Sequence, residues 1–166
     1  SNSVFKLSVL ALGTVALVAC SNSEKKQIAA ESYVDWVDPL IGSGGHGHVF
    51  VGASIPHGMI QLGPNNNKKG WDWCSGYHDS DSTIIGFAHT HLSGTGIADL
   101  GDILLMPAVS VIDSAGYLPS SAYVSTFLKQ EELVTPGFYQ VKLHPSGVNV
   151  ELTAGERVGM HRYVYP

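Results

Sequence analysis

Charged residues are scarce in this sequence of 166 residues. Asp, Glu, Lys and Arg make up 14% of it, whereas about a quarter is usual for a globular domain. The net charge is −5, so the chain has no excess of cations for binding a nucleic-acid backbone. Hydrophobic residues at 44% suffice for a core, and 19 glycines with 8 prolines indicate many turns. This balance favours an exported protein that handles neutral ligands.

Cysteine is also scarce, and the first of the two cysteines ends an apolar leader. Leu7 to Ala19 is too short for a transmembrane helix, which needs about 20 apolar residues, and it fits the apolar region of a signal peptide. A small residue directly before Cys20, with Leu17 three positions earlier, resembles the bacterial lipobox, in which the cysteine is lipidated. An ordinary signal peptide with an incidental cysteine is the alternative. Ser21 after the cysteine favours the outer membrane of a Gram-negative cell, on the periplasmic face or the cell surface.

These features divide the chain into three parts. We expect residues 1–20 to be a lipoprotein signal peptide, 21–32 a flexible tether, and 33–166 a folded domain that is incomplete at its C-terminus. If Cys20 carries lipid, it cannot pair with Cys74. We therefore expect Cys74 to be a free thiol that is buried in a pocket wall.

Long helical patterns are absent from the mature chain. No stretch of 12 or more residues shows a 3.6-residue period. Three period-2 runs at 138–144, 148–154 and 158–166 are separated by short turn signals, and they predict an antiparallel meander. The fold class is therefore all-β, as a sandwich of antiparallel sheets. Shorter strands are expected at 59–62, 84–91, 103–112 and 123–127, with Pro107 splitting the third of these or placing it at an edge.

Two His-x-His pairs are candidates for binding chemistry: His46 with His48, and His89 with His91. On a strand, residues i and i+2 share a face, and histidine is a common zinc ligand. Asp99 and Asp102 could support such a metal site from outside. The alternative is that these histidines bind sugar hydroxyls or the backbone.

The stretch from Trp71 to Asp102 reads WDWCSGYHDSDSTIIGFAHTHLSGTGIADLGD, and its apolar residues are interrupted by polar groups that need partners when buried. An indole offers an apolar face, and a neighbouring carboxylate offers acceptors. Sugars need this pairing, because they have an apolar C–H face and a rim of hydroxyls. Strand alternation would place Trp71 and Trp73 on one face and Asp72 on the other. A core tryptophan beside a turn aspartate is the alternative.

Aspartates are numerous in the same stretch. A glycosidase requires two carboxylates across the scissile bond, but the spacing does not show which pair would serve. Asp79 and Asp81 are expected to lie in turns. The candidates are Asp72, Asp79, Asp81, Asp99 and Asp102.

Several phrases in order resemble the N-terminal domain of glycoside hydrolase family 92, the bacterial calcium-dependent exo-α-mannosidases. They are VDPLIGSGGHGHVFVGASIPHGMIQLGP, WDWCSGYHDSDSTIIGFAHTHLSGTG, DLGDILLMP and ERVGMHRYVYP. The resemblance implies an N-terminal β-sandwich and a C-terminal (α/α)6 barrel that this chain lacks. It implies an inverting enzyme that removes terminal α-linked mannose, by α-1,2 or related linkages, from mannans or N-glycans.

The resemblance also divides the roles. It places the general acid, the general base and the Ca²⁺ ligands in the barrel, so none of these roles is assigned here. It places one wall of the mannose site in this chain, with Trp71 and Trp73 packing against sugar. The implied substrate-binding residues are Gly44, Gly45, His46, Trp71, Asp72, Trp73, Cys74, His89 and His91.

Two other functions stay open at this point. The domain alone could be a carbohydrate-binding module on the cell surface, or the histidines could build a metal-dependent enzyme. Departures from the family pattern at His57, Asn65–Asn67 and Asp79 affect the expected specificity for linkage.

Overall fold

The computed structural model describes residues 32–94, 96–98, 100–110 and 112–166. The signal-peptide, lipidation and tether predictions, Cys20 included, lie outside this part apart from Ser32. Among the described residues no helix is long and apolar enough to cross a membrane. The elements are η1 (Tyr33–Trp36), β1 (Gly63–Asn65), η2 (Trp71–Trp73), β2 (Thr83–Ile84), β3 (Gly86–Ala88), η3 (Ser120–Tyr123), β4 (Ser125–Thr126), η4 (Lys129–Glu131), β5 (Glu132–Thr135), β6 (Phe138–Lys142), β7 (Asn149–Ala154) and β8 (Gly159–Val164).

The main sheet is an antiparallel meander with the strand order β5-β6-β7-β8. Its register pairs Val141 with Val150, and Val150 with Tyr163. Alternation buries one face, because successive side chains of a strand point to opposite sides; Tyr139, Val141, Val150 and Leu152 are at most 1% exposed. The predicted meander is therefore confirmed, with β5 as an additional strand.

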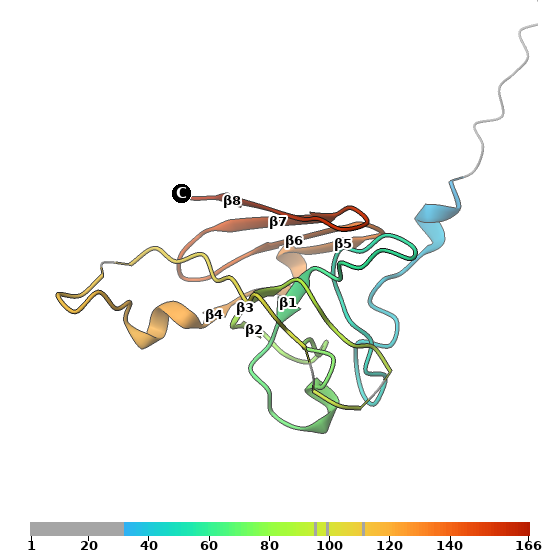
Figure 1. The fold of residues 1–166 in the computed structure, drawn as a ribbon, viewed down its shortest axis with the longest axis horizontal. Coiled ribbons are helices and arrows are strands. Elements are labelled where there is room, and N and C mark those ends of the chain that lie inside the picture. The colour runs from blue at the N-terminus through green and yellow to red at the C-terminus, as the bar shows by residue number, and fades with distance from the viewer. Residues whose placement is uncertain (1–31, 95, 99, 111) are drawn as a thin grey trace, which may run out of the picture. The chain divides into compact units, whose positions relative to one another are not determined.

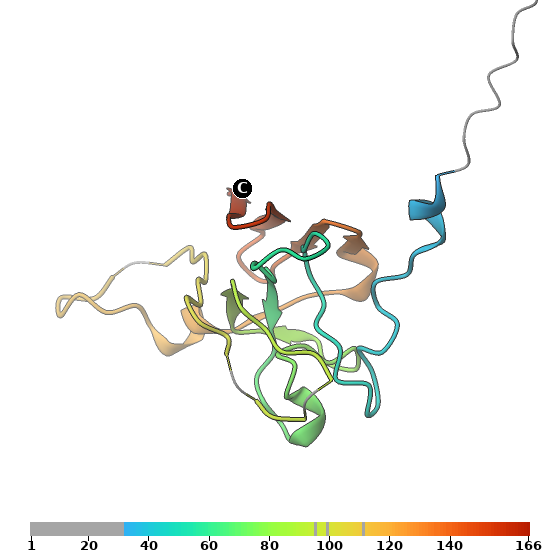
Figure 2. The same ribbon diagram turned by 45° about the vertical axis from the view of Figure 1, so that its right-hand side comes forward.

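Two small antiparallel sheets lie against the buried face of the meander. One pairs β1 with β3, and the other pairs β2 with β4. Figures 1 and 2 show β1–β4 on one side of the β5–β8 layer in both views. The antiparallel all-β class is therefore confirmed. In the described residues, the fold consists of one four-stranded sheet and two two-stranded sheets.

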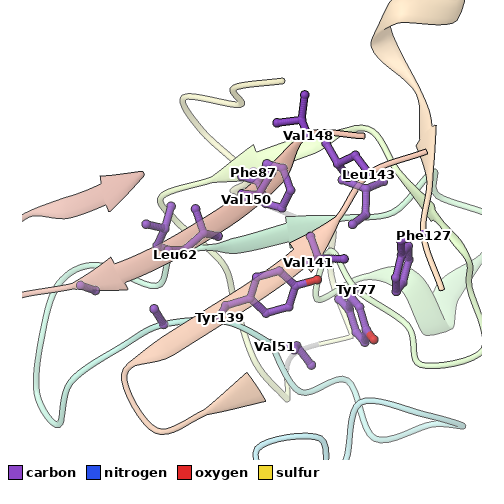
Figure 3. Packing of buried hydrophobic residues seen from close by; sticks show 14 residues of the cluster. Val51, Leu62, Tyr77, Phe87, Phe127, Tyr139, Val141, Leu143, Val148 and Val150 are labelled. Atoms are coloured by element: carbon purple, nitrogen blue, oxygen red, sulfur yellow. The ribbon is translucent and has the colours of Figure 1, made fainter. Parts of the chain in front are cut away.

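The core lies between these layers (Figure 3). Phe87 comes from β3, Leu62 directly precedes β1, and Tyr139 and Val150 come from the meander; each is fully buried. Burying one such side chain contributes about 1.5–3 kcal/mol. Tyr77, which follows η2, belongs to the same cluster, so the polar stretch around it is attached to the core.

Four short strands were placed imperfectly. Pairing near 59–62 is limited to a bridge between Ala53 and Leu62, and β1 begins only after the expected strand, at Gly63. The strand expected at 84–91 is divided at Ile85 into β2 and β3, and β3 begins at Gly86, whose φ is +152°. The strand expected at 123–127 is the two-residue β4, preceded by η3.

The apolar run at 103–112 forms no strand in its described residues, and its only pairing is a bridge from Leu105 to Phe87. Leu100 and Ile103 have φ of 69° and 56°. These values are unusual for large side chains, and for a β-branched residue they are strained. Pro107 lacks the N–H that a ladder needs. Turns in the backbone therefore override an apolar pattern that favoured a strand.

Candidate functional site

A glycine-rich loop from Gly42 to Val49 forms the first part of the candidate site. The loop closes on itself, because Val49 N donates to Gly42 O (3.1 Å) and Gly47 N donates to Gly44 O (3.2 Å). A Cβ at Gly47 would collide with the Gly42 carbonyl, so only glycine fits there. Gly45 has φ +55°, a left-handed conformation that also favours glycine.

The carbonyl groups of this loop are bound to the scaffold. Ser43 O accepts from Asp79 N (3.0 Å), Gly45 O accepts from His78 Nε2 (3.2 Å), and His48 O accepts from Gly94 N (2.7 Å). The amide side is different. The N–H groups of Gly44, Gly45 and His46 donate no hydrogen bond within the described part of the chain, and all three residues are exposed. The loop therefore presents donors outward, where oxygen atoms of a ligand could accept them.

Asp72 joins both histidines of the loop to η2. Its Oδ1 lies 2.6 Å from His46 Nδ1 and 3.2 Å from His48 Nε2. The hydrogen bond from His46 is the main cause that holds the pKa of the Asp72 carboxyl below its usual value, with His48 adding to it against partial burial. Asp72 is thus an ionised acceptor whose two bound donors fix its orientation.

Trp71 supplies an exposed indole to this cluster, with 59% of its surface accessible. Its ring packs edge-on against His48 (centroids 4.1 Å apart, 87°) and lies 5.7 Å from the His46 ring. Gly96 approaches the indole so closely that a Cβ there would lie 2.9 Å from Trp71 Nε1. The ring is therefore held in place while much of its surface stays open. We call Gly44, Gly45, His46, Trp71 and Asp72 the Trp71 platform.

Trp73 has a different environment from Trp71. The expected strand alternation is wrong, because residues 71–73 form the 3-10 helix η2, in which residues two apart point about 120° away from each other. One face of the Trp73 ring stacks on His78 (4.3 Å, 22°), and its Nε1 donates to Asp81 Oδ2 (2.9 Å). Trp73 is therefore fixed in the scaffold.

A cleft of ≈ 230 Å³ lies beside Trp73. Cys74 and His91 also line it, together with Asn65, Asn66 and Asn67. Cys74 is 5% exposed and is a free thiol, as expected. The nine expected site residues thus divide into the Trp71 platform, this cleft and His89.

His91 is buried at the base of the cleft. Its Nδ1 donates to Gln61 O (2.7 Å), its Nε2 lies 2.7 Å from the Asn65 side-chain amide, and Phe50 stacks on its ring (4.9 Å, 26°). Burial lowers the pKa of His91 to about 4, against a smaller opposing effect of the Gln61 carbonyl. This imidazole is therefore neutral at neutral pH.

His89 contacts a separate group of residues. Its Nε2 lies 3.2 Å from Nε2 of His161, whose Nδ1 is 2.8 Å from the Tyr163 hydroxyl. Burial first, and His89 second, lower the pKa of His161. The two histidines of the second His-x-His pair therefore have different partners. Nowhere in the described ranges do three His, Cys, Asp or Glu side chains gather in a way that could hold a metal ion.

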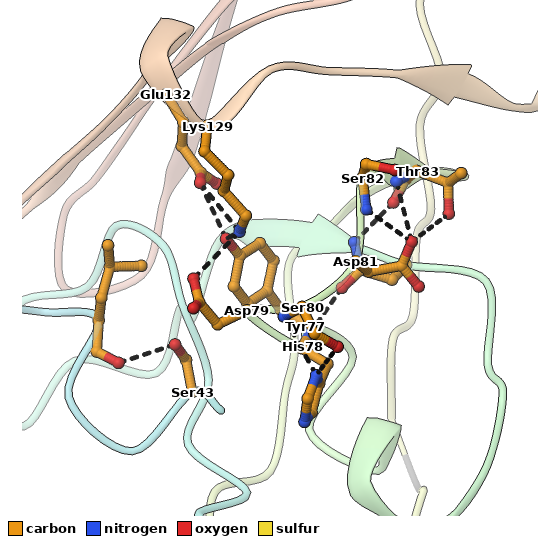
Figure 4. Close-up of polar contacts among 12 residues, drawn as sticks. Ser43, Tyr77, His78, Asp79, Ser80, Asp81, Ser82, Thr83, Lys129 and Glu132 are labelled. Carbon is orange, nitrogen blue, oxygen red and sulfur yellow. Dashed lines mark hydrogen bonds and ion pairs between the residues drawn. The ribbon is translucent and has the colours of Figure 1, made fainter. Parts of the chain in front are cut away.

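Two other aspartates of the stretch, Asp79 and Asp81, contact scaffold residues rather than the platform. Asp81 has a side chain with 0% exposure, and its Oδ1 accepts from the backbone and hydroxyl of Thr83. Its Oδ2 pairs with Lys69 Nζ (2.8 Å). Burial raises the pKa of Asp81, but the hydrogen bonds, led by that from Lys69, outweigh it and lower the pKa to about 2. Asp79 is exposed and pairs with Lys129 (3.1 Å), while Asp99 lies outside the described residues. Figure 4 shows the contacts of Asp79 with Lys129 and of Asp81 with Ser82 and Thr83.

Sequence reasoning missed several residues that shape the site. The His78 ring stacks on Trp73, and its Nε2 donates to Gly45 O. Asp81 accepts a hydrogen bond from Trp73 Nε1, and Gly96 lies close to the Trp71 indole. The phrase YHDSD between η2 and β2 contained a signal, since a histidine within a polar turn must find partners when buried. Its partners lie up to 33 residues away in sequence, so spacing alone could not identify them.

Comparisons with known proteins identify the class of this chain. It is 40% identical to a family GH92 α-mannosidase from Bacteroides thetaiotaomicron, solved in complex with mannoimidazole, with a TM-score of 0.74 over 82% of this chain and 18% of that one. An inverting mannosidase of the same family from Bacteroides thetaiotaomicron VPI-5482 is 25% identical, with a TM-score of 0.62 over 81% of this chain and 18% of that one. An uncharacterized secreted glycosidase of Arthroderma benhamiae is 29% identical over 79% of this chain and 17% of its own length. The class is thus that of the glycosidases.

The family follows from a direct match. The model of the glycosyl hydrolase family 92 N-terminal domain covers residues 36–166. The chain belongs to this family, and it spans less than a fifth of the length of the relatives above. The resemblance drawn from the sequence motifs is confirmed.

Proposed function

We propose that this chain is the N-terminal part of an inverting exo-α-mannosidase that removes terminal α-linked mannose, by α-1,2 or related linkages, from mannans or N-glycans. The Trp71 platform supports this proposal most directly. It combines an exposed indole, an ionised and oriented Asp72, and the backbone N–H groups of Gly44, Gly45 and His46, which have no partner among the described residues. An apolar face beside acceptors and donors suits a pyranose, which has C–H groups on one face and hydroxyls at its rim.

The bond-breaking groups are proposed to come from a C-terminal (α/α)6 domain. Inversion requires a carboxylic acid and a carboxylate about 6.5–9.5 Å apart, with a water between one of them and the sugar. In the described residues, Asp72 and Asp81 are each engaged by two or more donors. These carboxylates can orient ligands or scaffold, and we assign neither the acid nor the base to them.

Calcium is proposed for the whole enzyme, with its ligands outside this chain. Ca²⁺ takes six to eight oxygen ligands, and no cluster of three candidate ligand side chains occurs in the part of the chain that is described. The described residues therefore do not fit the ion. The chain's own contribution is to hold and orient the sugar.

A group of apolar side chains beside the site supports the second domain as a partner. Leu100, Ile103, Leu104 and Leu105 are each 42–68% exposed. Contiguous exposed apolar surface marks interaction sites in soluble proteins. We propose that this surface packs against the C-terminal domain. We also propose that Cys20 anchors the exported protein to the outer membrane.

The replacement Trp71→Ala tests the platform in the full-length protein. Loss of ring contact with the sugar is expected to lower kcat/KM on α-1,2-mannobiose about tenfold, since an aromatic contact contributes about 1–1.5 kcal/mol. Trp36→Ala is the matched control, because Trp36 is 72% exposed and lies in η1. NMR of the first product also tests the mechanism: β-mannose shows inversion. Equal effects of the two replacements would contradict the platform.

The 166-residue chain alone is expected to show no hydrolysis of aryl α-mannosides, because the acid and base are assigned to the missing domain. Mannose release by the purified chain, measured with and without a chelator, checks this. Chelator-sensitive turnover would overturn the assignment. Stoichiometric binding of mannobiose by the chain in calorimetry would instead favour a carbohydrate-binding module.

A further inference from the structure

His78 lies beneath the glycine loop and is buried, with 7% of its surface exposed. Its two nitrogens have different functions. Nδ1 accepts from Ser80 N (3.2 Å) and lies 2.8 Å from Ser80 Oγ. A neutral ring whose Nδ1 accepts must carry its hydrogen on Nε2. Nε2 therefore donates, and its partner is Gly45 O at 3.2 Å.

The ring of His78 is fixed from a second direction. It stacks on Trp73, whose Nε1 is bonded to Asp81, and Asp81 is paired with Lys69. The position of Nε2 is thus determined by a buried, fully bonded carboxylate. The next residue, Asp79, binds the same loop through its own N–H to Ser43 O. Figure 4 shows His78 and Asp79 side by side in this turn.

The direction of these bonds has a consequence for the loop. The scaffold occupies the carbonyl oxygens of Ser43 and Gly45, and a peptide whose carbonyl points inward directs the following N–H outward, because the two groups are trans in a planar peptide. The N–H of His46 belongs to the peptide of Gly45. His78 therefore determines where that donor points.

We infer that His78 is a positioning residue: through Nε2 and the Gly45 carbonyl it holds the His46 amide toward the ligand. The inference rests on the proposed function for the identity of the ligand, a terminal mannose, and on geometry alone for the positioning. Trp73 then has a second role besides lining the cleft. Trp73 supports His78 with one ring face, so its contribution to sugar binding passes through the loop as well as through the cleft.

Two replacements separate the functions of the His78 ring. His78→Phe keeps the stack on Trp73 and removes the donor to Gly45 O. His78→Gln removes the stack and keeps an N–H near the position of Nε2. Phe is expected to raise KM of the full-length protein for α-1,2-mannobiose about fivefold, the loss expected for one hydrogen bond, with kcat changed less than about twofold. Gln is expected to restore most of the loss.

A measurement on the 166-residue chain tests positioning without any substrate. In amide NMR spectra, His78→Phe is expected to shift the signals of Gly44, Gly45 and His46 and to leave those of β6–β8 unchanged. Unshifted loop signals would overturn the inference, as would a fall in kcat at constant KM, or signals lost throughout the spectrum in Phe but not in Gln. Shifted loop signals in a full-length protein that cleaves no α-mannoside would support the positioning and contradict the proposed mannosidase function.

Discussion

Replacing Asp81 with alanine is expected to lower the free energy of unfolding by about 3–5 kcal/mol, because its buried carboxylate is the acceptor for several donors and each unpaired buried donor costs about 1–3 kcal/mol. The carboxylate has 0% exposure and pairs with Lys69 at 2.8 Å. Its removal would also leave the Trp73 indole N–H and the N–H groups of Ser82 and Thr83 without their acceptor. Each buried donor without a partner costs about 1–3 kcal/mol, so the effect does not depend on the ion pair alone.

Urea unfolding of three variants measures this effect. Asp81→Asn keeps the shape and the acceptor for the Thr83 turn but loses the charge opposite Lys69, so we expect it to lie between wild type and Asp81→Ala. Asp113→Ala is the matched control: Asp113 Oδ1 also accepts two backbone N–H groups (2.8 and 2.9 Å), but at an exposed turn. We expect about 1 kcal/mol or less for it. Equal losses for Asp81→Ala and Asp113→Ala would show that burial of Asp81 contributes nothing.

The Asp81 network links stability to the proposed site. Asp81 holds Trp73, Trp73 stacks on His78, and His78 binds the Gly45 carbonyl. A buried polar network of this kind fixes a geometry only when every member is bonded. No buried side-chain nitrogen or oxygen among the described residues lacks a hydrogen-bond partner. The buried polar side chains under the platform are therefore fully hydrogen-bonded, while the platform keeps its indole exposed.

A second buried network ties the same turn to the meander. Glu132 is 2% exposed in its side chain, and it accepts from the hydroxyls of Tyr77 (2.8 Å) and Tyr139 (2.7 Å). Lys129 contacts Glu132, the Tyr77 hydroxyl and Asp79. Burial, followed by the charge of Glu132, raises the pKa of both tyrosines above the usual value. Both therefore stay protonated donors, and they connect β5 and β6 to the turn that carries His78.

The parts of the fold that sequence could predict are those with local causes. The meander was predictable because side chains of β6 and β7 alternate and short turns separate the strands. β1 to β4 have only two or three residues each, which is too short for a periodic signal. Their pairing joins residues more than 20 apart, such as Pro64 with Phe87 and Ile84 with Ser125. Packing in the tertiary core, rather than the local sequence pattern, therefore determines where these strands form and with which strands they pair.

The candidate site shows the same division. Residue types identified the His46–His48 pair and the WDWC phrase as candidates for binding chemistry, and Asp72 does join them. The distinction between Trp71 and Trp73 was not accessible, because it depends on the 3-10 geometry of η2 and on which indole meets His78. Equally, nothing in the spacing of His89 and His91 shows that one contacts His161 and the other Gln61. Partners that are distant in sequence decide these roles.

Acidification is expected to destabilise the chain through His91 between pH 6.5 and pH 4. The unfolded pKa of histidine is about 6.5, and burial lowers the folded pKa to about 4. Above pH 6.5 the ring is neutral in both states, so the stability from the buried ring is fully present. As pH falls below 6.5, the unfolded state takes up the proton first, so the stability falls until the folded state also protonates near pH 4. The loss over this window is about 3 kcal/mol.

Unfolding free energies at pH 7, 5.5 and 4.5 test this expectation against His91→Asn. The asparagine amide can still donate to Gln61 O, which accepts from His91 Nδ1 in the wild type, but it does not titrate. We expect the variant to be less stable at pH 7, because the stack on Phe50 is lost, and to lose less stability on acidification. Asp81 does not confuse the comparison, because its pKa of about 2 places its own loss below about pH 4. Parallel pH profiles for wild type and variant would show that protonation of His91 does not cause the loss of stability on acidification.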